Sequence, residues 1–139
     1  MPGLSDTRAA AVLNRLFNGA TLTVPSSYYI ALSTTEPADD GTGVTEPTAT
    51  SYARLAVAVN TTNFPTTATR IITNGVALTF ATPGAAEDWG VIGWYALYDA
   101  STGGTFHGWG LFANAQQVTT ATGPVTIAVG DLILTAPGS

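Results

Sequence analysis

The sequence predicts a mainly β protein, an antiparallel β-sandwich or jelly roll of about seven or eight strands with one short N-terminal α-helix. Short segments rich in β-branched and aromatic residues recur at spacings of roughly 8 to 15 residues, and Gly, Pro, Asn and Asp separate them. A helical pattern occurs only near the N-terminus, so the chain lacks the strand–helix alternation of a parallel α/β sheet. We expect a single domain over residues 1–139, with the helix at 5–18 and the sandwich at 27–135.

Residues 5–18 carry the helical pattern. Ser5 can cap the first turn, Asp6 lies at the positive end of the helix dipole, and Gly19 provides a stop signal. Apolar residues recur at i, i+3, i+4, i+7 and i+8 and form one stripe: Ala9, Val12, Leu13, Leu16 and Phe17. An apolar stripe must dock on another surface. We expect it to pack on the protein's own sheet, and a neighbouring subunit is the alternative.

Strands are expected in the segments that follow Pro25. The third and fourth segments are joined by Asn74-Gly75, a strong signal for a short hairpin. A turn with the sequence DASTGG, residues 99–104, joins the fifth and sixth, and the last segment bends at Gly130-Asp131, where a bulge or tight bend fits. The expected segments are Tyr28–Ser33, Tyr52–Asn60, Arg70–Thr73, Val76–Phe80, Val91–Tyr98, Thr105–Phe112 and Val125–Leu134.

The composition excludes several classes of function. Charged residues make up 9% of the chain, with four cations, all arginine, against nine carboxylates and a formal net charge of −5. Duplex binding needs clustered Lys and Arg, so nucleic acid is not an expected ligand. The absence of cysteine removes disulfides, thiol nucleophiles and Cys-based zinc sites. No apolar run approaches the roughly 18 residues of a membrane span, and we expect neither a membrane partner nor a signal peptide.

The acidic loop, residues 34–47, reads TTEPADDGTGVTEP and is the first candidate for a binding site. Its carboxylates and glycines fall in an otherwise weakly charged chain: Glu36, Asp39, Asp40, Gly41, Gly43 and Glu46. The spacing does not match an EF-hand, a dinucleotide-binding turn or a phosphate loop, which needs a Lys that the chain lacks. Weak Ca²⁺ binding by Asp39 and Asp40 stays open. The prolines and glycines instead favour a defined, solvated turn between two strands.

His107 is the only histidine of the chain and the first candidate for a catalytic base. No GxSxG nucleophile motif accompanies it, so a Ser-His-Asp triad is not expected. Strict alternation would put His107 on the same strand face as Thr105 and Trp109, near the surface or at a subunit contact. Glu87 and Asp88 could serve a glycosidase, but the chain is short for a sugar-binding cleft. We expect no enzymatic activity, no catalytic residue, no cofactor and no metal.

Short motifs follow one another in a characteristic order after the helix. They are YIALSTTEPADDGTG at 29–43, VTEP at 44–47, YAR at 52–54, Asn74-Gly75 ahead of LTF at 78–80, DWG at 88–90, YDA at 98–100 with Gly103-Gly104, and GDL at 130–132. In order and spacing they resemble a family of small tailed-bacteriophage virion proteins, labelled tail-fibre or head-decoration proteins. The resemblance covers nearly the whole chain after the helix. It implies a non-enzymatic structural protein of the phage particle.

Between the two labels, we expect a capsid decoration, or cement, protein that oligomerises and stabilises the major capsid shell. The chain has neither the heptads nor the repeats that a fibre shaft uses. The alternative is a tail or head fibre protein that binds a receptor or a carbohydrate. The expected partners are copies of itself, as a homotrimer, and the phage major capsid protein. We expect the protein on the virion, at the capsid surface rather than the tail, after synthesis in the host cytoplasm.

Candidate contacts with these partners are apolar and aromatic side chains. A surface poor in long charged side chains loses less conformational entropy when a partner immobilises it, which favours an assembly component over a free enzyme. Tryptophan and tyrosine in such a chain are more typical of core or interface anchors than of a sugar-binding platform. The candidates are Leu13, Leu16, Phe17, Trp94, Tyr95 and Trp109. The same residues would serve equally well in the core of a monomer.

Overall fold

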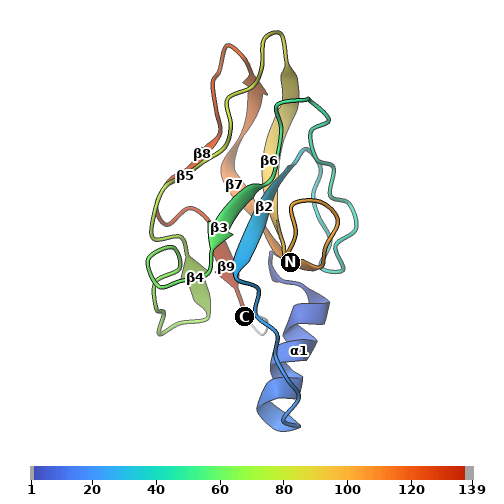
Figure 1. The fold of residues 1–139 in the computed structure, drawn as a ribbon, viewed down its shortest axis with the longest axis vertical. Helices are drawn as coiled ribbons and strands as arrows, with labels where there is room; N and C mark the ends of the chain where they lie inside the picture. Colours follow the sequence, from blue (N-terminus) through green and yellow to red (C-terminus); the bar gives the residue numbers. More distant parts are fainter. Residues whose placement is uncertain (1, 137–139) are drawn as a thin grey trace.

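The computed structural model describes residues 2–136, and this part of the chain forms one helix and nine strands (Figure 1). The elements in chain order are β1 (Gly3–Leu4), α1 (Asp6–Phe17), β2 (Ser27–Ser33), β3 (Leu55–Ala58), β4 (Ile71–Thr73), β5 (Leu78–Thr79), β6 (Asp88–Tyr98), β7 (Phe106–Thr119), β8 (Thr126–Ile127) and β9 (Ile133–Thr135). The structure therefore confirms the mainly β fold with one short N-terminal helix.

A five-stranded antiparallel sheet forms the centre of the molecule. Its strand order is β1-β7-β6-β2-β3, and the hairpin of β6 and β7 is its longest pairing. Two short ribbons, β4 with β9 and β5 with β8, form separate two-stranded sheets. Both ribbons contribute side chains to the same core as the main sheet, an arrangement compatible with the predicted sandwich.

The two faces of the main sheet are covered in different ways. One face carries the larger core, where residues of β2 and β6 such as Leu32 and Leu97 share a cluster with Ile127 and Leu134 of the ribbons. The other face carries a smaller cluster of Ala31, Ala96 and Trp109, with Val44 of the acidic loop packed against it. The acidic loop thus replaces a second sheet on that face.

The predicted hairpin at Asn74-Gly75 is wrong. The strands on either side of it do not pair with each other, because β4 pairs with β9 and β5 pairs with β8. Asn74 is 1% exposed, and its amide donates to the carbonyls of Val76 and Ala128. Its side-chain oxygen accepts from the amides of Gly130 and Leu132, so all its hydrogen-bonding capacity is used inside the core. Asn74 therefore joins two chain segments instead of forming a turn.

The predicted alternation around His107 is also wrong. The pairing passes from Leu97 opposite Gly108 to Tyr98 opposite Phe106, which leaves His107 as an extra residue in β7. This irregularity puts Phe106 and Trp109 in the same cluster, whereas the imidazole of His107 stacks edge-on against Tyr28. His107 is 7% exposed and is therefore a buried residue rather than one near the surface.

Candidate interaction surface

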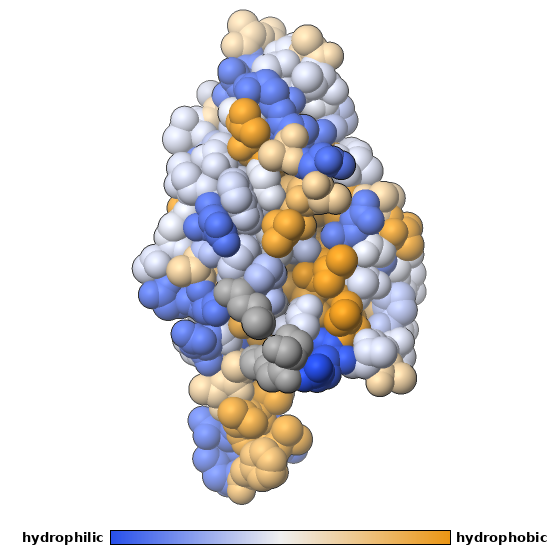
Figure 2. All heavy atoms as spheres, turned by 180° about the vertical axis from the view of Figure 1, so that it is seen from behind, coloured by the Kyte–Doolittle hydropathy of each residue, from blue (hydrophilic) through white to orange (hydrophobic). Residues whose placement is uncertain are grey.

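Helix α1 projects from the body of the protein (Figure 1). None of its residues is buried, and Leu13, Leu16 and Phe17 are 55%, 68% and 83% exposed. Figure 2 shows apolar side chains gathered on this helix and in a band on the body above it. The expectation that the helix packs on its own sheet is therefore wrong. We call Leu13, Leu16 and Phe17 the exposed stripe.

The start of α1 is fixed to the body by several hydrogen bonds. The backbone N–H of Ser5 donates to the carbonyl of His107 at 2.9 Å, and its hydroxyl donates to the carbonyl of Phe106 at 3.0 Å. The same hydroxyl accepts from the N–H of Arg8 as the predicted N-cap, and the N–H of Asp6 donates to the carbonyl of Asp39. The direction of the helix is therefore set at its first turn.

The chain after α1 returns along the helix. The guanidinium of Arg8 donates to the carbonyl of Thr23 at 2.7 Å, and the N–H of Ala20 donates to Asn14, in the last two turns of the helix. Gly19 takes a φ of 76°, the left-handed conformation of a helix C-terminus. These contacts support the helix on one side and leave the exposed stripe largely accessible to solvent.

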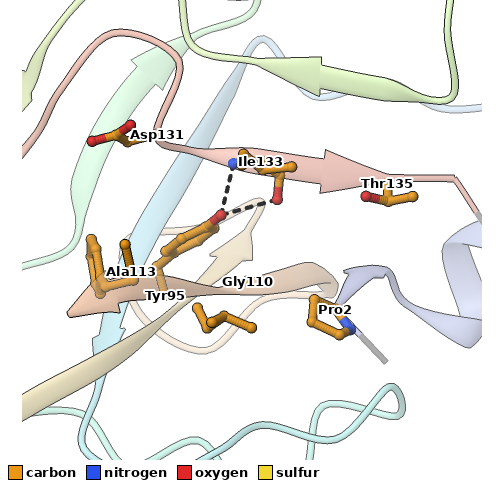
Figure 3. Close-up of a pocket in the computed structure, with 9 residues that line it drawn as sticks. Pro2, Tyr95, Gly110, Ala113, Asp131, Ile133 and Thr135 are labelled. Atoms are coloured by element: carbon orange, nitrogen blue, oxygen red, sulfur yellow. Dashed lines mark hydrogen bonds between the residues drawn. The ribbon is translucent and has the colours of Figure 1, made fainter. Parts of the chain in front are cut away.

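A second apolar surface lies between β7 and β9 (Figure 3). A pocket of about 290 Å³ opens there, and we call it the β7–β9 groove. Its lining is mainly apolar, with one carboxylate: Pro2, Tyr95, Leu111, Phe112, Asp131 and Ile133 are among its residues. The Tyr95 hydroxyl accepts from the N–H of Ile133 at 2.7 Å and donates to its carbonyl at 3.0 Å, which holds β9 beside β6. Leu111 and Ile133 are 53% and 45% exposed.

The acidic loop is fastened to the body of the protein. Asp39 accepts a hydrogen bond from the indole N–H of Trp109 at 2.9 Å, and Asp40 accepts from the N–H and the hydroxyl of Thr42. Those hydrogen bonds lower the pKa of Asp40, the backbone N–H having the largest effect. Gly41 lies against the ring of Phe106, where an added Cβ would approach to 2.9 Å. The loop is thus the defined turn that the sequence predicts.

Glu46, at the end of the loop, belongs to a structural cluster. Its carboxylate receives two hydrogen bonds from the guanidinium of Arg54, at 2.7 and 3.0 Å, and one from the hydroxyl of Tyr52 at 2.8 Å. Arg54 also lies 3.8 Å above the ring of Tyr98 and donates to the carbonyl of Ala100. Burial alone would raise the pKa of Glu46, but the hydrogen bonds and the charge of Arg54 lower it overall.

The candidates for catalytic groups have structural partners. His107 lies with Nε2 3.3 Å from Asp99, and burial lowers its pKa although Asp99 acts in the opposite direction. The carboxylate of Glu87 accepts from the hydroxyl of Ser51 and from the backbone N–H groups of Ser51 and Gly84. The carboxylates of Asp99 and Glu87 therefore each order a turn. Among the described residues, no serine is hydrogen-bonded to the imidazole of His107.

Within residues 2–136, no three His, Asp or Glu side chains gather in a way that could hold a metal ion. The described part of the chain has one helix, α1, and it is neither long nor apolar enough to cross a membrane.

The six predicted contact residues do not share one surface. Tyr95 and Trp109 are 1% and 2% exposed and belong to the protein's own core. Trp94 is half-buried and packs against the Ala31 cluster. Only the exposed stripe of α1 is available to a partner, and its contact remains a prediction. Sequence reasoning missed the β7–β9 groove, because its lining comes from segments far apart in the chain, among them Tyr95, Leu111 and Ile133.

The fold and the surface define a small β-rich protein with a projecting amphipathic helix. The family model described as Podophage GP4 fiber I protein gp80 matches residues 3–135, which is nearly the whole chain. The chain belongs to this family, and the resemblance to tailed-phage virion proteins is confirmed. No curated protein matches the chain. The family's description names a fibre, which fits the fibre alternative better than capsid decoration.

Proposed function

We propose that this protein is a non-enzymatic building component of a fibre on a tailed-phage particle. The observation that carries the proposal is the match of the fibre-protein family over residues 3–135. A structural role needs a stable body and a surface for assembly. The closed core of the main sheet and the exposed stripe of α1 fit these two requirements.

A building role is favoured over glycan recognition by the positions of the tryptophans. Sugar-binding platforms present flat aromatic rings to solvent. Trp89 and Trp109 are each 2% exposed, and Trp94 is half-buried against Ala31 and Ala96. The chain therefore presents no surface with more than one accessible tryptophan among its described residues.

The test is the position of the protein on intact particles. Cryo-EM of particles made with and without this protein should show fibre density that is present only in the first. The same particles, heated in steps, should release their DNA at the same temperature, because a fibre component does not hold the shell together. Density lost from the capsid surface, with earlier DNA release, would replace the proposal by capsid decoration.

A further inference from the structure

Two asparagines of the chain are each followed by a glycine, in Asn18-Gly19 and Asn74-Gly75. In this dipeptide the side-chain amide of asparagine lies within reach of the backbone nitrogen of the next residue. Glycine has no side chain to hinder the approach of that nitrogen, and its backbone adopts the required conformations without steric strain. Attack of this nitrogen on the amide carbon removes the amide group, which is one reason that asparagine is thermolabile. The structure decides which of the two pairs can react.

The pair Asn74-Gly75 is held on both sides of this reaction. Asn74 is 1% exposed, and the four hydrogen bonds of its side-chain amide use every donor and acceptor of that group. The backbone N–H of Gly75, which carries the attacking nitrogen, donates to the carbonyl of Asn63 at 2.8 Å. The reaction would have to break these bonds inside the protein, where an unpaired polar group is costly. Asn74 is therefore protected for as long as the fold is closed.

The pair Asn18-Gly19 follows the end of α1 that points away from the sheet (Figure 1). Both residues are exposed, and the backbone N–H of Gly19 makes no hydrogen bond to any residue of the described chain. Apart from its neighbours in the chain, nothing lies within 4 Å of the position that a Cβ of Gly19 would occupy. The attacking nitrogen is therefore free and accessible here, whereas the nitrogen of Gly75 is bonded.

The side-chain amide of Asn18 is held only by hydrogen bonds at the surface. Its Nδ2 donates to Oδ1 of Asn14 at 3.1 Å, and its Oδ1 accepts from the backbone N–H of Ala20 at 3.0 Å. Exchanging such exposed bonds for bonds to water costs little free energy. The backbone of Asn18 has a ψ of 2°, and ring closure requires it to rotate. That rotation opens only the end of the helix, where the free energy of local opening is smallest.

We propose that Asn18 is a site of spontaneous deamidation, with the backbone nitrogen of Gly19 as the nucleophile. This nitrogen forms a bond to Cγ of Asn18 and gives up its proton to water. The bond between Cγ and Nδ2 breaks, and Nδ2 keeps the electron pair, takes up a proton and leaves as ammonia. The product is a cyclic imide, and water then adds to one of its two carbonyls and opens the ring to aspartate or isoaspartate. Water is the only other reactant, and nothing is oxidised or reduced.

The reaction changes the end of α1 and leaves its start intact. It adds a negative charge to a chain of formal net charge −5 and puts it at the negative end of the helix dipole. It also removes the Nδ2 donor to Asn14, and isoaspartate lengthens the backbone and displaces the N–H of Ala20 from the carbonyl of Asn14. The last turn, with Leu16 and Phe17, should therefore loosen, whereas Ser5 still holds the first turn.

Trypsin separates the two pairs for mass spectrometry, because the chain has arginine but no lysine. Cleavage after Arg15, Arg54 and Arg70 puts Asn18 in peptide 16–54 as its only asparagine, and Asn74 in peptide 71–139. The folded protein is kept at physiological temperature and mildly alkaline pH, and samples are digested at intervals. Peptide 16–54 should gain the mass that separates aspartate from asparagine and should give two products, aspartate and isoaspartate, with fragment ions that place the change at residue 18.

The two pairs serve as each other's control. In the folded protein, deamidation at Asn18 should be at least about 10-fold faster than at Asn74, because the buried bonds of Asn74 must open first. In urea both pairs are unprotected and should react at similar rates. If Asn18 stays intact in the folded protein while the chain in urea reacts, the proposal is overturned. Equal rates at the two pairs in the folded protein would overturn it as well.

Two variants test the assignment to Asn18. Asn18→Gln keeps an amide at the helix end but needs a larger ring that closes more slowly, so it should abolish the mass gain of peptide 16–54. Asn114→Gln is the matched control, because Asn114 is also exposed but precedes Ala115, whose side chain hinders the attack. This variant should leave the mass gain of peptide 16–54 unchanged. A gain that persists in Asn18→Gln would come from another residue and would overturn the assignment.

Hydrogen exchange measures the structural consequence. In the deamidated protein, separated from the unmodified protein by ion exchange, the backbone amides of the last turn of α1 should exchange several-fold faster. Those of the main sheet should exchange as before, because the first turn is still fixed to the body. Unchanged exchange in the last turn would contradict the loosening. The proposal does not rest on the fibre function, since it concerns the chemistry of the isolated chain.

Discussion

The acidic loop, residues 34–47, and helix α1 reverse the roles that their sequences suggest. The loop concentrates carboxylates in a weakly charged chain, yet Asp39, Asp40 and Glu46 bond to groups of their own chain. The helix has the pattern of an ordinary core-facing helix, yet its largest apolar side chains face solvent. The loop that looks like a binding site is bonded within its own fold, and the helix that looks like a core element is the one left exposed.

The difference teaches where to look for function in a protein of this kind. A charged group signals a ligand only when its hydrogen bonds are not already made inside the fold. A contiguous patch of apolar side chains signals a partner when the fold leaves it uncovered. Both conditions depend on tertiary neighbours, so neither can be read from the spacing of residues alone.

The largest difference expected between the acidic loop and the helix is between two arginines. Arg54→Met removes both hydrogen bonds to Glu46 and the contact with Tyr98, and it should lower the free energy of unfolding by about 2 to 3 kcal/mol, less than for a fully buried pair. Arg15→Met on α1 should change it by less than about 0.5 kcal/mol. Urea denaturation measures both. Equal losses would mean that the helix is as integrated in the fold as the loop.

A pair of glycines sharpens the comparison. Gly43 in the loop and Gly19 after the helix have similar φ values, 81° and 76°. A Cβ at Gly43 would lie 2.7 Å from the carbonyl oxygen of Glu36, whereas at Gly19 nothing lies within 4 Å. Replacement by Ala should therefore cost about 2 kcal/mol at Gly43 and about 1 kcal/mol at Gly19, where only the backbone conformation is unfavourable. Thermal denaturation of the two variants measures the difference, and a larger loss at Gly19 would contradict this account.

Local signals in the sequence were sufficient for much of the fold. The helix begins and ends where its cap residues Ser5 and Gly19 predict, and the turn at 99–104 joins β6 to β7 as expected. These features depend on residues close together in the chain. The prolines and glycines of the acidic loop likewise predicted a defined turn. They did not predict its anchoring partner, Trp109, which lies 70 positions from Asp39.

The errors arise where distant residues override local preference. Asn74-Gly75 has the sequence of a hairpin turn, but the amide of Asn74 bonds to chain segments more than 50 residues away. His107 is an extra residue in β7, so the alternation of side chains expected there fails. This irregularity depends on the pairing of β7 with β6 and cannot be predicted from the sequence of β7 alone. Whether the stripe of α1 packs on its own sheet depends on the direction that Ser5 and Asp6 give the helix. The groove needs β9 placed beside β7, which sequence spacing does not predict.

A further prediction concerns the dependence of stability on pH through His107, whose carbonyl accepts from Ser5 at the start of α1. Burial lowers the pKa of His107, so the unfolded chain takes up a proton from pH about 6.5 downward while the folded chain resists it. Stability should be constant above that pH and fall as the pH decreases, by at most about 1.4 kcal/mol per pH unit for one proton. Urea denaturation at pH 7.5 and 5.5 measures the loss, and His107→Gln should reduce it. If the wild type loses no stability between these two pH values, the assignment of the pH dependence to His107 is wrong.

The smallest effect is expected where the apolar side chains are most exposed. Leu13→Ser should change the free energy of unfolding by less than about 0.5 kcal/mol in dilute solution, because Leu13 is 55% exposed and lies outside the core clusters. Leu32→Ala, at a residue with no exposed area, should cost about 2 to 5 kcal/mol under the same conditions. Raising the protein concentration should stabilise the wild type but not Leu13→Ser, since association stabilises the folded state by mass action. A loss of more than about 2 kcal/mol for Leu13→Ser at every concentration would show instead that the stripe belongs to the core of its own chain.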